Sequence, residues 1–295
     1  MNDNNGNKYR NKKERKGGVK YADLHVHTIF SDGTFTPEET VRVARDRGLA
    51  CIAICDHDCV DGIDPSIEYS KKNPIEIIPG VELTVIKDRK EIHMLGYFIS
   101  WREEWFNKIL KRIQAERISR IDKMIEKLKR FNIEVHPDRV LSMAGGKGSV
   151  GRLHLAQALV EIKAVSSIQM AFNKYIGDFK PCYVGDISFS PKEAIEVILR
   201  ANGVPVLAHP CTIGNDSLIQ EFVKYGMRGI EVFHTDHSLS INKKYEKIAK
   251  EYGLLVTGGS DCHGLGKGRV LLGSVRVPYS VVERLKKEAN TIKRP

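Results

Sequence analysis

Short, mostly apolar runs alternate with amphipathic stretches along much of the chain. "KYADLHVH" is followed by "TPEETVRVARDRG", whose apolar positions recur at helical spacing, and then by "LACIAICDHD". The order strand, helix, strand is typical of a parallel sheet or barrel. Thr36, followed by Pro37 and two glutamates, predicts the start of the first helix, and Gly48 predicts its end.

This alternation stops between residues 101 and 181, where every segment has a helical pattern. It returns with the apolar runs "GVPVLAHP", "MRGIEVFH" and "GLLVTGGSDCH". We therefore expect an α/β unit built from residues 21–100 and 182–295, interrupted by a helical insertion at 101–181. Residues 1–20 are polar and rich in Asn, Gly and Lys, which predicts a disordered basic arm.

Composition narrows the class of protein. The chain has 295 residues, of which 41% are hydrophobic, and none of its apolar runs approaches the ~18 residues that a membrane span needs. No apolar leader is visible at the N-terminus, so a cytoplasmic enzyme that contacts no membrane is the expectation. The six cysteines form no C-x-x-C pair and are expected to be buried free thiols.

The formal net charge is +10, and residues 1–20 contribute seven Lys and Arg against two acids. A basic arm on a basic body suits an anionic partner such as a nucleotide or nucleic acid. Solubility alone would also account for the charge. Nothing in the sequence indicates an obligate protein partner.

Histidines and acids recur where predicted strands end. His25 and His27 lie two residues apart, so they share one face of a strand and can point at one ion. The carboxyl ends of barrel strands form the rim on which such folds build their chemistry. The candidates at this rim are His25, His27, His57, Glu82, His93, His209, Asp261 and His263.

These residue types indicate a metal centre. Imidazole and carboxylate groups bind manganese, zinc or iron, and the lack of thiolates argues against a purely structural zinc site. A lone histidine would more simply be structural. Here, however, the motifs H-x-H, S-D-G, D-H-D, P-G-V-E, I-H, A-H-P and S-D-x-H follow one another in that order. Together they predict a catalytic site.

From about Tyr21 to Gly273, these motifs resemble the PHP phosphoesterases, a family named for its polymerase and histidinol phosphatase members. Within the helical stretch, "GRLHLAQALV" and "AFNKYIG" are similar to the branch that dephosphorylates nucleoside 3′,5′-bisphosphates and trims short RNA from the 5′ end. The resemblance implies a distorted, TIM-like (β/α)7 barrel, a helical cap over its mouth and three divalent ions.

The resemblance also implies how the ligands are shared. The first ion would be held by His25, His27, Glu82 and Asp261, the second by Glu82, His93 and His209, and the third by Asp32, His57 and His263. Three nearby carboxylates, Asp23, Asp56 and Asp58, are expected either to orient ligand imidazoles or to serve as ordinary turn residues.

Clustered cations neutralise phosphate oxygens and lower the pKa of a bound water toward ~7, so we expect a hydroxide that bridges the ions to be the nucleophile. The leaving oxygen needs a proton. The resemblance points to His237 in "HTDHS" for this role, with His234 as the rival and a surface-loop histidine as the plain alternative.

A second phosphate site is expected on the insertion. Arg152 and His154 fall in the first turn of a predicted helix, with Ser149 as a plausible N-cap. A helix N-terminus with an arginine is suited to anions. Arg117 and Arg120 of the preceding long helix either assist in binding substrate or form a solvated basic face.

Three functions remain open at this point. The first is a phosphoesterase acting on nucleoside 3′,5′-bisphosphates and the 5′ ends of short RNA. The second is a histidinol-phosphate or cyclic-nucleotide phosphatase, and the third is a metal-bearing module that only binds nucleic acid. The complete ligand set favours catalysis over binding alone.

Overall fold

The computed structural model describes residues 19–145, 149–185 and 188–292, so nearly all of the expected basic arm lies outside the described residues. The strands are β1 (Tyr21–Val26), β2 (Cys51–Ile54), β3 (Glu76–Lys87), β4 (Lys90–Tyr97), β5 (Val204–Leu207), β6 (Gly229–His234), β7 (Leu255–Gly259) and β8 (Val277–Pro278). The α-helices are α1 (Pro37–Asp46), α2 (Ile63–Ser70), α3 (Glu104–Leu128), α4 (Pro137–Met143), α5 (Arg152–Glu161), α6 (Ile168–Ala171), α7 (Pro191–Arg200), α8 (Ser217–Tyr225), α9 (Leu239–Tyr252) and α10 (Ser280–Ile292). Shorter helical turns are η1 (Lys129–Phe131), η2 (Phe172–Ile176) and η3 (Pro210–Ile213).

The eight strands form one mixed sheet in the order β7-β6-β5-β4-β3-β2-β1-β8. A bridge between Val26 and Cys262 joins the β1 end to the segment after β7, so the sheet nearly closes into a barrel. The close approach requires Gly259, because a Cβ there would lie 2.4 Å from the Cβ of His25. The expected α/β barrel is confirmed.

Two features of the sheet differ from a purely parallel seven-stranded barrel. β4 runs antiparallel to both β3 and β5. A two-residue strand, β8, adds to the edge of β1 in the antiparallel sense. Reversal of β4 follows from its short connection to β3, since parallel neighbours need a crossover of a dozen or more residues.

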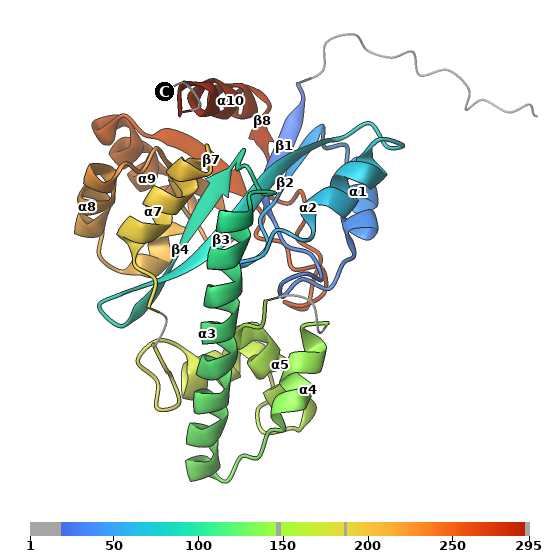
Figure 1. The fold of residues 1–295 in the computed structure, drawn as a ribbon, viewed down its shortest axis with the longest axis vertical. Coiled ribbons are helices and arrows are strands. Elements are labelled where there is room, and N and C mark those ends of the chain that lie inside the picture. Colours follow the sequence, from blue (N-terminus) through green and yellow to red (C-terminus); the bar gives the residue numbers. More distant parts are fainter. Residues whose placement is uncertain (1–18, 146–148, 186–187, 293–295) are drawn as a thin grey trace, which may run out of the picture.

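Alternate residues of the strands pack into two hydrophobic layers. Ile52 and Ile54 of β2 face the outer helices, whereas Cys51, Ala53 and Cys55 belong to the cluster inside the barrel. Leu285 and other apolar residues of α10 complete this inner cluster. Figure 1 shows α10 lying across the end of the barrel near β8. The C-terminal helix therefore closes the barrel at the end opposite the ligand-bearing loops.

The first helix is capped as predicted. Thr36 accepts a hydrogen bond from the Glu39 amide at 3.2 Å, and the Glu39 carboxylate accepts one from the Thr36 amide at 2.9 Å. Gly48 follows the helix with a φ of 72°, a conformation that glycine adopts without strain.

The helical segment is carried by α3, which extends from the barrel to the group of short helices at the bottom of Figure 1. The first half of α3 packs on the barrel through Phe106, Leu110 and Ile113. A separate hydrophobic cluster is drawn from residues 121–184 alone. Among the described residues, no helix combines the length and apolar character needed to cross a membrane.

Candidate metal centre

Glu82 stands at the centre of the site, midway along β3. Its Oε2 lies 3.1 Å from His25 Nε2, 3.2 Å from His27 Nε2 and 3.3 Å from His57 Nδ1. Its Oε1 lies 2.9 Å from His93 Nδ1 and 3.0 Å from His209 Nε2. One buried carboxylate is thus approached by five imidazoles from four different parts of the chain.

His93 reaches Glu82 in a way that the sequence did not indicate. It lies near the start of β4 and not at a strand's carboxyl end, and it pairs with Thr84 across the β3/β4 ladder. Because β4 is reversed, the beginning of this strand lies at the same rim as the carboxyl ends of the parallel strands. The expectation of a common strand-end position is therefore wrong for His93, and also for Glu82 midway along β3, although both residues arrive at the rim.

Two further carboxylates complete the cluster. Asp261 Oδ1 lies 3.1 Å from His27 Nε2 and 3.5 Å from His25 Nε2. Asp32 Oδ1 lies 3.2 Å from His263 Nε2. Three groups have ligand atoms within 4.8 Å of one another: His25, His27, Glu82 and Asp261; His27, Asp32, His57 and His263; and His57, Glu82 and His93. His209 joins through Glu82 and through His93 Nδ1, which is 3.3 Å from His209 Nε2.

Hydrogen bonds to Asp56 hold the loop that carries Asp32. The Asp56 carboxylate accepts hydrogen bonds from the Thr28 amide at 2.7 Å and from the Ser31 hydroxyl at 2.6 Å. Gly33 allows the loop to fold back, because a Cβ there would lie 2.8 Å from the carbonyl carbon of His27. The S-D-G motif is thus explained by a tight turn that brings Asp32 beside the histidines.

Asp23 and Asp58 also hold backbone. Asp23 accepts from the amides of Ser260 at 2.8 Å and Gly273 at 2.7 Å, and Asp58 accepts from the Thr84 amide at 2.9 Å. Among the described residues, neither of them, nor Asp56, forms a hydrogen bond or ion pair with an imidazole ring. The three aspartates therefore position ligand-bearing segments and do not orient the rings directly.

Glu231 and Glu91 orient the rings instead, and the sequence reasoning missed both. Glu231 is fully buried and accepts from His25 Nδ1 at 3.1 Å and from the His209 amide at 2.9 Å. Glu91 Oε1 accepts from His93 Nε2 at 2.9 Å. Each carboxylate fixes one ring nitrogen as the donor and leaves the other free to bind an ion.

The donor atoms fit divalent metal ions. Several of the converging atoms are buried and have no hydrogen-bond partner, a state that is costly unless something else binds them. They are His25 Nε2, His27 Nε2, Asp32 Oδ1, His57 Nδ1 and Glu82 Oε2. Because all of them are nitrogen or carboxylate oxygen, the set suits a catalytic ion of the manganese, zinc or iron type.

The pKa of the central carboxyl agrees with a site that binds positive charge. Burial favours a raised pKa for the Glu82 carboxyl, but the charges on His57, His25 and His93 outweigh it and hold this pKa well below its usual range. Burial likewise opposes protonation of His27 and His93, yet the surrounding carboxylates raise their pKa values to about 9 and about 10. Burial lowers the pKa values of His57, His209 and His263 instead, so the histidines of the cluster are not alike.

Two site residues have unusual backbone. His209 and Asp261 have backbone φ values of 23° and 51°, which residues other than glycine rarely adopt. Such strain persists only where the surrounding structure holds it, and it concentrates at functional sites.

A cavity of about 430 Å³ opens over the cluster. Of the four residues expected to bind substrate, Arg117 and Arg152 line it. Arg152 Nη2 contacts Glu91 Oε1 at 3.0 Å, and its Nη1 contacts Asp178 at 2.8 Å, so its guanidinium is fixed in place. Lys267, which the sequence reasoning missed, also lines the cavity and lies 2.7 Å from Asp261 Oδ2.

The other two expected substrate-binding residues lie elsewhere. His154 is buried and its Nδ1 accepts from the Gly151 amide at 3.0 Å, so it caps α5. Gly151, and not Ser149, is the N-cap residue. Arg120 pairs with Glu91 and donates to the Val184 carbonyl. The alternative of a solvated basic face is wrong, because Arg117 and Arg120 are only 5% and 4% exposed.

His234, and not His237, lines this cavity. His234 Nε2 lies 3.4 Å from Asp261 Oδ2. His237 donates from Nδ1 to the Val232 carbonyl at 2.7 Å and forms part of the wall of a neighbouring cavity.

An α/β barrel with a rim of histidines and carboxylates defines the class of metal-dependent hydrolases. The family model for the PHP domain matches residues 23–143. The chain is 33% identical to a 3′,5′-nucleoside bisphosphate phosphatase of Chromobacterium violaceum, over 83% of this chain and 88% of that protein. It is 32% identical to a 5′-3′ exoribonuclease of Haemophilus influenzae, over 87% of this chain and 97% of that protein.

A solved structure of a protein from Bifidobacterium adolescentis, predicted to be a metal-dependent phosphoesterase, superposes on this structure with a TM-score of 0.83 at 31% sequence identity. The superposition covers 90% of this chain and 96% of the Bifidobacterium chain. The chain belongs to the PHP family and is a metal-dependent phosphoesterase.

Proposed function

We propose that this enzyme removes the 3′-phosphate of nucleoside 3′,5′-bisphosphates and cleaves nucleotides from the 5′ end of short RNA. The observation that carries the proposal is the composition of the cavity over the metal cluster. Arg117, Arg152 and Lys267 supply positive charge, while Leu153 and Phe172 supply an apolar wall from the helical segment. Phosphates require the first kind of surface and a nucleoside the second.

The chain's own residues would hold three ions in the sets expected from the sequence. His25, His27, Glu82 and Asp261 have ligand atoms close to one another, and so do Asp32, His57 and His263, with His27 beside both groups. His93 and His209 meet at the second oxygen of Glu82. When bound, the ions neutralise phosphate oxygens and lower the pKa of a coordinated water.

Substrate orientation is assigned to the fixed cations. Arg152 is held by Glu91 and Asp178, so it presents its guanidinium without first having to be ordered. Lys267 lies beside the ligand Asp261, where it can contact a phosphate at the cluster. Two such anchor points, one beside Glu91 and one beside Asp261, suit a substrate with two phosphates.

The proton for the leaving oxygen is assigned to His234 Nε2. This ring lines the cavity, whereas the ring of His237, the residue favoured by the resemblance, does not. Because a general acid must come within hydrogen-bond reach of the leaving oxygen, position favours His234.

Hydrolysis with added manganese tests the proposal, and it is followed as release of inorganic phosphate for the monoesters and by chromatography of the nucleotide products for the RNA and the cyclic nucleotide. The substrates are 3′-phosphoadenosine 5′-phosphate, AMP, histidinol phosphate, a cyclic nucleotide and a short 5′-phosphorylated RNA. We expect turnover of the bisphosphate and the RNA by the wild type, near-complete loss in His209→Ala, and no loss in His136→Ala, which removes an exposed histidine. Turnover of histidinol phosphate or the cyclic nucleotide alone would replace the proposed substrate, and silence on all five would favour a binding module.

A further inference from the structure

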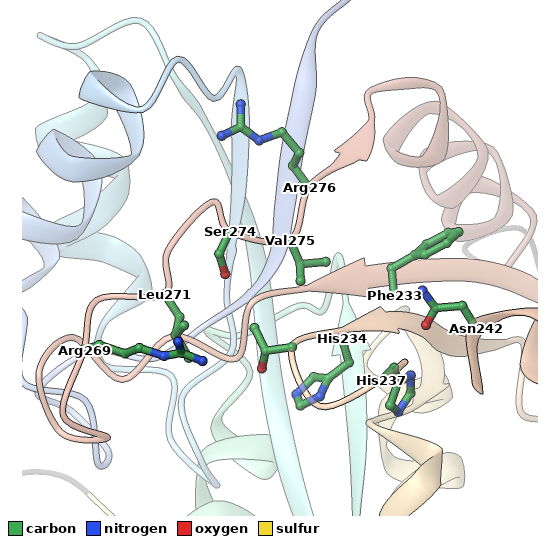
Figure 2. Close-up of a pocket in the computed structure, with 10 residues that line it drawn as sticks. Phe233, His234, His237, Asn242, Arg269, Leu271, Ser274, Val275 and Arg276 are labelled. Atoms are coloured by element: carbon green, nitrogen blue, oxygen red, sulfur yellow. The ribbon is translucent and has the colours of Figure 1, made fainter. Parts of the chain in front are cut away.

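The neighbouring cavity that His237 helps to line has a volume of about 520 Å³ and is called the second cavity. In the view of Figure 2, Arg269 extends toward this cavity from one side, Asn242 lies on the other, and His234 lies between them. The walls combine apolar side chains, such as Phe233 and Leu271, with hydroxyl groups of Thr235 and Ser274.

The lining of the second cavity includes positively charged residues and no acidic ones. Arg269 and Arg276 line it, and no aspartate or glutamate is among its lining residues. Among the described residues, Arg269 has no hydrogen-bond or ion-pair partner. Arg276 donates to the Gly273 carbonyl at 3.2 Å and lies over the Tyr21 ring, without a carboxylate partner.

The arginines of the metal cavity differ in this respect. Arg117 and Arg152 each have a carboxylate within 3.0 Å. The second cavity therefore carries positive charge that the protein itself does not neutralise. Such a surface attracts an anion, and guanidinium groups suit phosphate oxygens in particular.

The two cavities adjoin along two segments of the chain. His234 lines both. After it, Thr235 and His237 face the second cavity, whereas Asp236 faces the metal cavity. In the segment after β7, Lys267 lines the metal cavity and Arg269 lines the second one. A ligand bound over the metal cluster can thus extend past His234 to Arg269.

We propose that the second cavity binds the phosphodiester backbone of an RNA downstream of its 5′-terminal nucleotide, with Arg269 as its main contact. This inference rests on the proposed function and deepens it, because a mononucleotide fits within the metal cavity and gains nothing from Arg269. Binding of RNA in the second cavity would distinguish a nuclease that shortens RNA chains from a phosphatase restricted to mononucleotides.

Two measurements on Arg269→Ala test this proposal. We expect the ratio of kcat/KM for a 5′-phosphorylated pentaribonucleotide to kcat/KM for the bisphosphate to fall about tenfold, as for loss of one charged hydrogen bond. We also expect the salt dependence of RNA binding, log Kd against log salt, to lose about 0.7 of its slope, as for one phosphate contact on a single strand. Binding is followed by fluorescence anisotropy in a His209→Ala background to prevent cleavage.

Arg284→Ala is the control, because it removes the same charge from an exposed position of α10 that lines neither cavity. It should change neither quantity. An unchanged slope and ratio in Arg269→Ala, or an equal loss on both substrates, would overturn the inference. If the wild type hydrolyses neither substrate, the proposed function fails, and the binding slope alone then decides whether Arg269 contacts RNA.

Discussion

At the scale of single residues, the metal centre depends on which nitrogen of each imidazole carries the proton. Glu231 accepts a hydrogen bond from His25 Nδ1, and Glu91 accepts one from His93 Nε2, so opposite nitrogens face Glu82 in the two rings. Partners of this kind fix the tautomer and raise the basicity of the ligand nitrogen. Glu231 also holds the strained His209 backbone through the amide.

Replacing Glu231 by Gln should lower metal affinity about 10- to 100-fold, because a neutral amide oxygen accepts the His25 Nδ1 hydrogen bond more weakly than a carboxylate does. Competition with a chromogenic chelator measures the change, and far-UV circular dichroism reports whether the fold is kept. Glu283→Gln on exposed α10 is the matched control. Unaltered affinity in Glu231→Gln would show that the ring needs no such partner.

The nine ligand candidates were predictable from the sequence because they follow apolar runs in a fixed order of motifs. Glu91 and Glu231 were not, since an acid within a strand looks the same in sequence whether its face is solvated or buried. Arg117 and Arg120 show the same ambiguity. Their spacing indicates a helix but does not reveal that the barrel and the helical segment cover that face.

At the scale of elements, α3 connects the barrel to the helical segment through buried polar contacts. Arg117 Nη1 lies 2.7 Å from Asp58 Oδ2, and Arg117 Nε donates to the Val150 carbonyl at 2.6 Å. One side chain thus joins α3, the loop after β2 and the segment before α5. The alternation of strands with helices and the cap at Thr36 were visible in the sequence, whereas the reversal of β4 depends on pairing partners that a one-dimensional pattern does not contain.

Arg117→Ala should destabilise the protein by about 3–5 kcal/mol, because it leaves the fully buried Asp58 without its cation. Urea unfolding followed by tryptophan fluorescence measures the loss. Arg102→Ala breaks an exposed ion pair with Asp64 and should change the free energy of unfolding little. Equal effects of the two substitutions would contradict a structural role for the buried pair.

At the scale of the whole molecule, the barrel performs separate tasks at its two ends. α10 and the inner apolar cluster close one end, and the opposite rim carries the ligand cluster. The helical segment adds one wall to the metal cavity, and the loops after β6 and β7 contribute lining residues to both the metal cavity and the second cavity. The molecule thereby combines a fixed metal centre with positively charged surfaces that extend away from it.

The most direct test of this account is metal reconstitution of the chelated enzyme. Manganese is added in increments while phosphate release from 3′-phosphoadenosine 5′-phosphate is followed. The account predicts no activity after chelation and a rise that levels off as three equivalents bind. Full activity in the chelated protein, or bound manganese that restores none, would contradict a metal-dependent phosphoesterase centred on Glu82.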